Sequence, residues 1–309
     1  MSREIQILNP LRGLRRRLAE RATESDIWDA VQLARHEKRP YTLDYVRLLV
    51  DDWIELHGDR TGYDDPAMIA GIGSFRGRSI AIVGHQKGRD LKERQHRNFG
   101  MARPQGYEKA MRTFELANRL GFPVVTMIDT PGAFPGVDAE QRGQAGAIAR
   151  SMLTMARLQV PSVACVIGEG GSGGALAIGV ADRVLMCEHA IYSVISPEGC
   201  AAILWKDAAQ ARKAAVAFKP TARFCKDLGV VDTIVAEPSG GAHKDHERAA
   251  KLLGDEISEA LLSIESERGV PRRAARRAKF RAMGVFLENG VLVGEPEPER
   301  EDDPAPAPA

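Results

Sequence analysis

The chain has 309 residues, of which 44% are hydrophobic and 28% are charged, so it is long enough to bury a large core. Its 43 Lys and Arg residues nearly balance 42 Asp and Glu residues, and such a balance gives no bulk charge to recruit a polyanion. We therefore expect no nucleic-acid partner. We also expect a cytoplasmic protein without a membrane span, because no apolar run reaches the ~20 residues that a spanning helix needs and the first residues lack a signal-peptide core.

The N-terminal part of the chain shows helical periodicity followed by a hairpin pattern. Apolar residues recur at helical spacing in residues 11–35 and 42–56, which predicts two amphipathic helices. We interpret residues 1–56 as a helical arm. Residues 67–74 and 79–84 are apolar runs separated by a short Arg-Gly-Arg turn, and this pattern predicts a β-hairpin.

Two strand-loop-helix units follow in the middle of the chain. A helix is expected over residues 106–120, because Gly121 and Pro123 are usual stop signals. The buried-strand pattern of residues 122–129 then runs into a Pro-Gly loop and a helical stretch at 139–158. The apolar run 160–167 likewise leads into a glycine-rich segment. In a parallel sheet such loops gather at the carboxyl edge of the strands, where ligands bind.

The glycine-rich segment 168–176, with the sequence GEGGSGGAL, fits three patterns. A dinucleotide site would use Glu188 as its acid, but the helix that follows is short and carries a glycine. A nucleophile elbow would use Ser172, which we interpret as a small turn residue because no base is predicted within reach. In the third pattern, Gly173 and Gly174 open a helix whose unpaired N–H groups form an oxyanion hole.

The C-terminal part is predicted to be helical and then irregular. We expect a core over residues 57–248, C-terminal helices over 249–290 and a disordered tail rich in Glu, Pro and Ala over 291–309. The second C-terminal helix is strongly basic, and we interpret its cationic stripe as a solvated face. That stripe consists of Arg272, Arg273, Arg276, Arg277, Lys279 and Arg281.

The four cysteines predict no metal site of this chain's own. Cys165, Cys187, Cys200 and Cys225 form no Cys-x-x-Cys pair. Cys165 lies in an apolar run, where a free thiol behaves as a small hydrophobic side chain. We therefore expect reduced cysteines that pack in or near the core.

Several longer segments together resemble one protein family, the carboxyltransferase alpha subunit of bacterial-type acetyl-CoA carboxylase. They occur in the family's order and at similar spacing from about Ile27 to about His243. The segments are residues 39–45 (RPYTLDY), 84–89 (GHQKGR), 98–101 (NFGM), 128–136 (IDTPGAFPG), 168–179 (GEGGSGGALAIG) and 192–201 (YSVISPEGCA). The resemblance implies an α/β fold of the crotonase or ClpP-like spiral type, built from repeated ββα units.

The resemblance also implies a reaction and a set of partners. Such a subunit transfers the carboxyl group of carboxybiotin, held on a biotin carboxyl carrier protein, to acetyl-CoA, which gives malonyl-CoA for fatty-acid synthesis. A beta subunit with a zinc ribbon carries most of the acyl-CoA site, biotin carboxylase completes the enzyme, and an α2β2 assembly is expected. The alternative is an acyl-CoA hydratase or isomerase of the same fold, which would need no partner.

The resemblance places the site on backbone groups of two glycine segments. The oxyanion hole falls on Gly173 and Gly174, and the rest of the carboxybiotin site falls on Gly170, Gly171, Gly132, Ala133 and Phe134. Donors of this kind suit the negative charge that develops on the ureido oxygen during carboxyl transfer. Phe134 stands where relatives commonly have tyrosine.

Charged residues near these segments have less definite roles. Lys87 and Arg89 are candidates for a phosphate or partner contact. Glu198 invites a catalytic assignment, but at a helix start an acid is stabilising by itself, and we prefer that interpretation. For Glu169 we expect a bracing role through hydrogen bonds to backbone amides.

Overall fold

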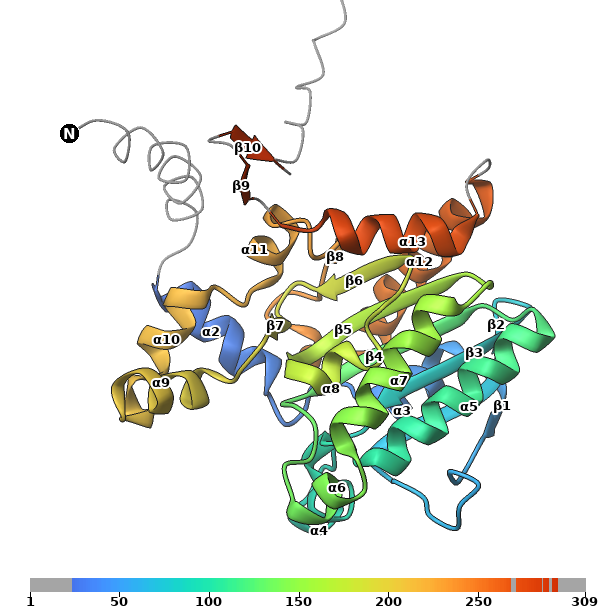
Figure 1. Cartoon of the computed structure of the whole chain (residues 1–309), viewed down its shortest axis with the longest axis horizontal. Coiled ribbons are helices and arrows are strands. Elements are labelled where there is room, and N and C mark those ends of the chain that lie inside the picture. The colour runs from blue at the N-terminus through green and yellow to red at the C-terminus, as the bar shows by residue number, and fades with distance from the viewer. Residues whose placement is uncertain (1–23, 268–270, 285, 289–290, 294–309) are drawn as a thin grey trace, which may run out of the picture.

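The computed structural model describes residues 24–267, 271–284, 286–288 and 291–293 (Figure 1). The first half of the helix expected over residues 11–35 and nearly all of the expected C-terminal tail lie outside these residues. The described chain forms one large sheet with helices packed against it. Helices α5 and α7 lie on one face, and α3 and α12 lie on the other (Figure 1).

The helices and strands have the following bounds. The helices are α2 (Glu24–Ala34), α3 (Thr42–Leu49), α4 (Leu91–His96), α5 (Pro104–Leu120), α6 (Val137–Gln141), α7 (Gln144–Arg157), α8 (Ser172–Leu176), α9 (Pro197–Trp205), α10 (Ala211–Phe218), α11 (Ala222–Asp227), α12 (His246–Ser266) and α13 (Arg272–Ala282), with short 3-10 turns η1 (Asn98–Gly100), η2 (Ala208–Gln210) and η3 (Ala242–Lys244). The strands are β1 (Asp51–Glu55), β2 (Met68–Phe75), β3 (Arg78–His85), β4 (Val124–Thr130), β5 (Ser162–Gly171), β6 (Arg183–Cys187), β7 (Ile191–Ser193), β8 (Thr233–Val235), β9 (Phe286–Glu288) and β10 (Val291–Val293).

The main sheet begins as an antiparallel meander and continues as a parallel sheet. Its strand order is β1-β2-β3-β4-β5-β6-β8, and β7 pairs with the end of β5. The expected hairpin is confirmed, because β2 and β3 pair antiparallel from Met68 opposite His85 to Phe75 opposite Arg78. From β3 onward every pairing is parallel. The carboxyl ends of β4 and β5 therefore lie side by side, which positions the segments that follow them.

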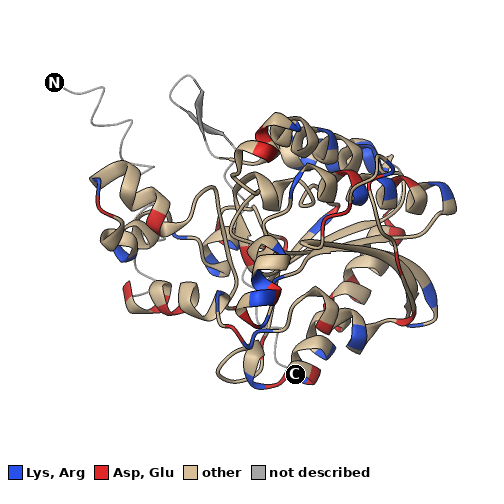
Figure 2. Ribbon diagram, turned by 90° about the horizontal axis from the view of Figure 1, so that it is seen from below, with Lys and Arg blue, Asp and Glu red and all other residues tan. Residues whose placement is uncertain are grey.

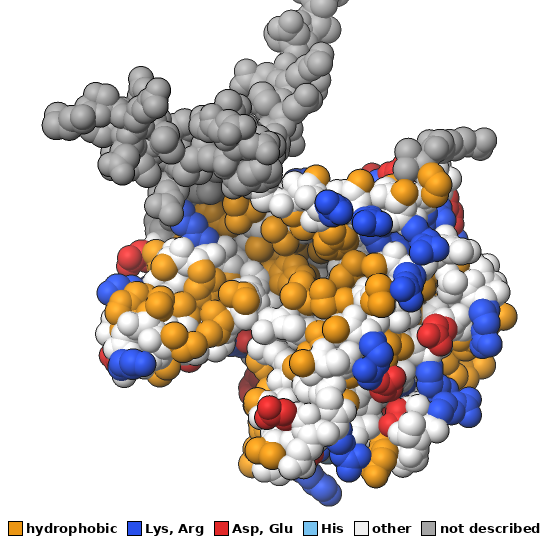
Figure 3. Space-filling model, in the orientation of Figure 1, with side chains coloured by type: hydrophobic (Ala, Val, Ile, Leu, Met, Phe, Trp, Pro, Cys, Tyr) orange, Lys and Arg blue, Asp and Glu red, His pale blue; other side chains and the backbone are white. Residues whose placement is uncertain are grey.

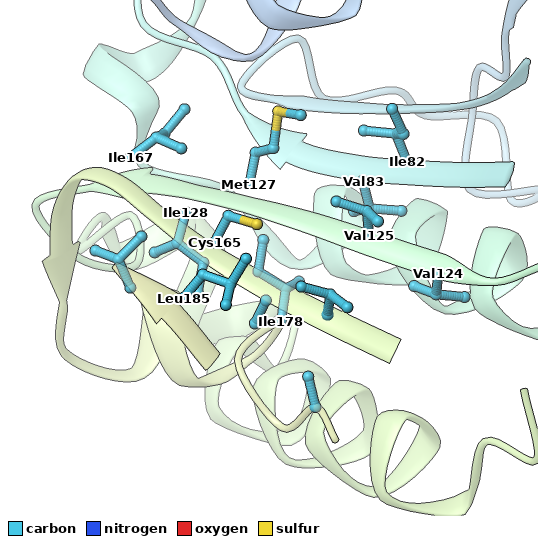
Figure 4. Packing of buried hydrophobic residues seen from close by; sticks show 14 of the residues in the cluster. Ile82, Val83, Val124, Val125, Met127, Ile128, Cys165, Ile167, Ile178 and Leu185 are labelled. Carbon is cyan, nitrogen blue, oxygen red and sulfur yellow. The ribbon is translucent and has the colours of Figure 1, made fainter. Parts of the chain in front are cut away.

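The central strands β4 and β5 are buried on both faces of the sheet, which explains their continuous apolar sequences. Every residue of β4 and β5 is buried, because helices cover both faces of the parallel part. Figure 4 shows Met127 and Ile128 of β4 among Cys165, Ile167 and neighbouring side chains. Three of the cysteines, Cys165, Cys187 and Cys225, are buried free thiols as expected.

The prediction of a helix over residues 42–56 is wrong for the second half of that range. Helix α3 ends at Leu49, and Asp51–Glu55 forms strand β1, which pairs with β2. The reason lies in glycines on the partner strand: a Cβ at Gly71 would lie 2.5 Å from the ring of Trp53, so the glycine leaves a slot for that ring. Tertiary packing of the indole overrides the local helical pattern.

The helix expected over residues 139–158 is also divided. It forms α6 and α7, with a break at Gly143. Gly143 has a φ of 79°, in the left-handed region that residues with side chains rarely adopt. The break lets the chain turn between the Pro-Gly segment after β4 and the long helix α7.

Our interpretation of the cationic stripe on helix α13 as a solvated face is wrong for half of its residues. Arg272, Arg276 and Lys279 point toward the protein. Arg276 is 2% exposed, and its guanidinium pairs with both carboxylate oxygens of Asp182 at 2.8–2.9 Å. Lys279 pairs with Asp232. The helix therefore docks through three of its six cationic residues. The other three, Arg273, Arg277 and Arg281, face solvent.

Charges of both signs are distributed over the rest of the fold. Lys and Arg residues and Asp and Glu residues are scattered over the helices and loops on all sides of the ribbon (Figure 2). Within the described residues there is no helix long and apolar enough to cross a bilayer. The same part of the chain contains no group of three or more His, Cys, Asp or Glu side chains placed to bind a metal ion.

Candidate active site

Two glycine segments meet at the carboxyl edge of the sheet. One follows β4 and contains Pro131 and Gly132, and the other spans the end of β5 and the start of α8. A Cβ on Gly174 would lie 2.7 Å from the carbonyl carbon of Gly132 and 2.8 Å from the nitrogen of Ala133. A Cβ on Gly171 would overlap the Pro131 carbonyl. The two backbones are thus in direct contact, which only glycine permits.

The segment from Gly168 to Gly171, which we expected as a loop, is strand. Strand β5 continues through Gly171, and its last residues pair with β7, with Gly170 opposite Tyr192 and Gly171 opposite Ser193. The chain turns only at Ser172, whose φ is 51°. Among the described residues no hydrogen bond joins Ser172 to a histidine or a carboxylate. The pairing with β7, which lies twenty residues further on, has no local sequence signal.

Gly173 and Gly174 occupy the first turn of α8. The N–H groups of a first helical turn have no intrahelical acceptor. A Cβ on Gly173 would find only the Ile148 side chain, no nearer than 3.5 Å, so this glycine is less tightly enclosed than Gly174. The short helix thus brings two adjacent main-chain donors to the end of the sheet.

The segment after β4 is held in place by its own hydrogen bonds. Gly132 has a φ of +155°, and the Thr130 hydroxyl both donates to its carbonyl at 2.6 Å and accepts from its N–H at 3.1 Å. The Phe134 N–H donates to the Ala102 carbonyl at 3.0 Å. The Arg103 guanidinium carbon lies 4.2 Å from the centre of the Phe134 ring. Gly132, Ala133 and Phe134 therefore form a rigid wall beside α8.

A narrow cleft opens beside these segments. Gly170 and Gly171 line it, but Gly132, Ala133, Phe134, Gly173 and Gly174 lie next to it rather than in its lining. The full lining is Arg35, Pro131, Glu169, Gly170, Gly171, Ile191, Ser193 and Ser196. Its volume of about 10 Å³ is too small for a bicyclic ring. A larger cavity of about 540 Å³ is lined by residues of α5 together with Leu56 and Arg60, away from the glycine segments.

An ion-pair network forms one wall of the cleft, to which Arg35 and Glu169 belong. Lys87 Nζ is 2.7 Å from Asp129 Oδ1 and 2.8 Å from Glu169 Oε2. Arg35, which directly follows α2, contacts the other oxygen of Glu169 at 2.7 Å and also contacts Glu198 at 2.7 Å. Burial by itself lowers the pKa of Lys87, but the two carboxylates outweigh it and raise that pKa. Burial likewise raises the pKa of Glu169, and Lys87 and Arg35 outweigh it and lower that pKa.

This network corrects our expectation for Glu169 and adds residues that the sequence did not indicate. Glu169 is braced by Lys87 and Arg35 side chains rather than by backbone amides. The sequence did not indicate Arg35 as a site residue, because a single arginine in an expected amphipathic helix is usually a surface residue. Glu198 lies in the first turn of α9, after the capping residue Ser196, and accepts two hydrogen bonds from Arg35.

Arg89 lies apart from the cleft. Its guanidinium pairs with Asp44, donates to the carbonyls of Glu37 and Arg39 at 2.8 Å, and lies 4.0 Å from the Tyr41 ring centre. It therefore holds the segment that enters α3. Its role in a phosphate or partner contact, like that of Lys87, stays a prediction.

A histidine next to this network predicts a pH-dependent stability. His85 is fully buried, and burial, together with the nearby Lys87 charge, lowers its pKa from 6.5 to about 3. Between these values the unfolded chain binds a proton that the folded chain does not, so stability falls as pH drops below 6.5. We expect a loss of roughly 2 kcal/mol between pH 6.5 and 5, measured by urea unfolding. The variant His85→Leu should flatten this slope, whereas His96→Leu, at an exposed position, should retain it; equal slopes in both would contradict the assignment.

Comparisons with known proteins agree with this geometry. A family model described as acetyl co-enzyme A carboxylase carboxyltransferase-like matches residues 1–284. The acetyl-coenzyme A carboxylase carboxyl transferase subunit alpha of Aquifex aeolicus is 54% identical over 287 residues, which cover 91% of this chain and 88% of that protein. The subunit of the same name from Thermus thermophilus is 53% identical over 290 residues, covering 92% and 90%.

Solved structures show the same fold at lower identity. Transcarboxylase 12S aligns with a TM-score of 0.60 and 21% identity over 75% of this chain and 43% of its own chain. The beta subunit of geranyl-CoA carboxylase from P. aeruginosa aligns with a TM-score of 0.58 and 16% identity over 82% and 48%. This chain thus spans less than half of either protein. The expected crotonase-type fold is confirmed.

The fold and the family match together define a crotonase-fold carboxyltransferase. Within that class, the chain belongs to the acetyl-CoA carboxylase carboxyltransferase family, and its relatives above are alpha subunits. The family resemblance seen in the sequence is therefore confirmed. A hydratase or isomerase function is not favoured by these relatives.

Proposed function

We propose that the chain, as a carboxyltransferase alpha subunit, transfers a carboxyl group from carboxybiotin on a biotin carboxyl carrier protein to acetyl-CoA, with malonyl-CoA as the product. The observation that carries this proposal is the contact of the two glycine segments at the end of β4 and β5. Carboxybiotin, when bound, supplies the group to be transferred. All other parts of the proposal concern what the residues of this chain do.

We assign the residues of this chain backbone roles. The Gly173 and Gly174 N–H groups donate hydrogen bonds to an oxygen on which negative charge develops, and fixed donors of this kind stabilise such charge without reorganising. Gly132, Ala133 and Phe134 form the facing wall, and Gly170 and Gly171 allow β5 to pack closely against Tyr192 and Pro131 at the edge of the cleft. Glu169 is a weak base in this setting, because its ion pairs with Lys87 and Arg35 lower its pKa.

The narrow cleft supports a site that is completed by a partner. The free chain offers too little volume for the biotin ring, so we assign the rest of the site to a beta subunit with a zinc ribbon and the acyl-CoA site. Large apolar side chains are exposed close by: Val194 is 79% exposed, and Ile203 and Leu204 on α9 are 63–64% exposed. Figure 3 shows hydrophobic side chains gathered over α9 and around the hollow beside it. Such exposure favours a protein contact.

We infer that the functional assembly is α2β2 and works with the carrier protein and biotin carboxylase. The test is reconstitution of the purified chain with the beta subunit and the biotinylated carrier, with malonyl-CoA measured from acetyl-CoA. We expect product only when this chain is present. Product without it would leave the chain a noncatalytic part of the complex. Turnover of crotonyl-CoA by the chain alone would instead support a hydratase.

A further inference from the structure

One buried lysine lies where several of the signature segments converge. Lys87, from the segment GHQKGR, has a side chain only 13% exposed. Its amine contacts Asp129, which lies two residues before Pro131, and Glu169, which directly precedes Gly170. The two carboxylates thus come from the ends of neighbouring strands, and each lies one or two residues from a glycine segment of the site.

Two glycines of the signature segments make room for this ion pair. A Cβ on Gly168 would overlap Asp129 Oδ1. A Cβ on Gly100, which has a φ of +81°, would lie 2.8 Å from Lys87 Cγ. These glycines are therefore explained by the packing of Lys87 and Asp129 rather than by a bound ligand.

The network ties the strand ends to one another and to the wall of the cleft. The Glu169 N–H donates to Asp129 Oδ1 at 2.9 Å, on the same oxygen that Lys87 contacts. Arg35 extends the network from Glu169 to Glu198 at the start of α9. The other oxygen, Asp129 Oδ2, has no hydrogen-bond partner among the described residues. Lys87 is thus the cation that compensates the buried Asp129 carboxylate.

We propose that Lys87 is a positioning residue for the carboxyl transfer. It holds the two glycine segments at the spacing at which the Gly173 and Gly174 donors face the Gly132–Phe134 wall. Together with Arg35 it also offsets most of the negative charge of Asp129, Glu169 and Glu198. Uncompensated negative charge in a low-dielectric region would oppose the negative charge that develops at the nearby site. We call the contacts of Lys87 with Asp129 and Glu169 the clamp. The effect on rate rests on the proposed function, whereas the clamp is a property of the free chain.

The variant Lys87→Met tests this proposal, because it retains the aliphatic length and removes the charge. In the reconstituted complex we expect kcat to fall about 100-fold, as for a small misplacement of catalytic groups, with KM for acetyl-CoA nearly unchanged. In the free chain we expect faster amide hydrogen exchange in residues 130–136 and 169–176. The variant Lys87→Arg keeps the charge and should restore part of both properties.

A matched control is Lys109→Met on α5. Lys109 is even more deeply buried than Lys87, at 1% exposed, and contacts Asp64 at 2.6 Å away from the glycine segments. It should lower stability without changing kcat or exchange in those segments. If Lys87→Met behaves like this control, the proposal is overturned, and the same holds if the segments loosen while kcat is unchanged.

If Lys87→Met does not fold, Glu169→Gln removes one arm of the clamp and is judged by the same two measurements. A wild-type complex that forms no malonyl-CoA would refute the proposed function, and the exchange comparison would still decide whether the clamp exists.

Discussion

Alanine at Gly174 is expected to reduce kcat for malonyl-CoA formation by about 100-fold in the reconstituted complex. The added Cβ would lie 2.7 Å from the Gly132 carbonyl carbon and 2.8 Å from the Ala133 nitrogen. These are backbone atoms, which cannot rotate away as a side chain could, so the two segments must separate. The N–H group at position 174 is retained, and the loss therefore reports the spacing of the donors and the facing wall rather than the removal of a donor.

The control for this variant is Gly146→Ala in α7. There the nearest atom to an added Cβ is Arg150 Nη1 at 3.3 Å, at the flexible end of a side chain. Alanine should be tolerated and should stabilise the helix by up to about 1 kcal/mol, with kcat unchanged. Steady-state rates with acetyl-CoA and the biotinylated carrier check both variants. A Gly174→Ala enzyme as fast as the wild type would contradict the assigned close contact.

The sequence predicted that the two glycine segments would meet at one edge of the sheet. Glycines placed after two buried strands indicated that both segments would meet at one sheet edge, and the contact of Gly174 with Gly132 agrees with this. The sequence could not indicate that Gly168 to Gly171 are strand, because the partner strand β7 is formed by residues twenty positions later. Long-range pairing of this kind has no local pattern.

The ion-pair network was missed for a related reason. Lys87, Asp129 and Glu169 lie in separate segments of the sequence, and no local pattern indicates that they pair with one another. Only the parallel order β3-β4-β5 brings them to the same edge of the sheet. With that order known, a Lys after β3 opposite an Asp ending β4 would have been a usable signal.

The elements themselves were predicted where periodicity was strong and tertiary contacts did not compete. The hairpin β2-β3 and helix α5 were placed within a few residues. Strand β1 was missed because Trp53 and Val50 satisfy a helical pattern as well as a strand pattern, and the glycines on β2 that favour the strand are not local to them. The same limitation affected the basic helix, because Asp182, which pairs with Arg276, lies 94 residues earlier in the chain.

The variant Arg276→Met should lower the free energy of unfolding by about 3–5 kcal/mol. The guanidinium is 2% exposed, pairs with both oxygens of Asp182 and donates to the carbonyls of Met155 and Leu158 at 2.8 and 2.9 Å. Removing it leaves the Asp182 carboxylate buried without its cation and two carbonyls without this donor. Equilibrium unfolding in urea, followed by circular dichroism, gives the free-energy difference.

Two further variants separate the ion pair from general effects of changing α13. Arg277→Met alters the next residue, which faces solvent, and should change stability by less than about 0.5 kcal/mol. The double variant Arg276→Met with Asp182→Asn removes the uncompensated charge and should recover part of the loss, because an amide costs less than a carboxylate in a buried position. If Arg276→Met were as stable as Arg277→Met, α13 would not be anchored through its cationic stripe. If the double variant recovered nothing, the lost carbonyl hydrogen bonds rather than the Asp182 charge would account for the destabilisation.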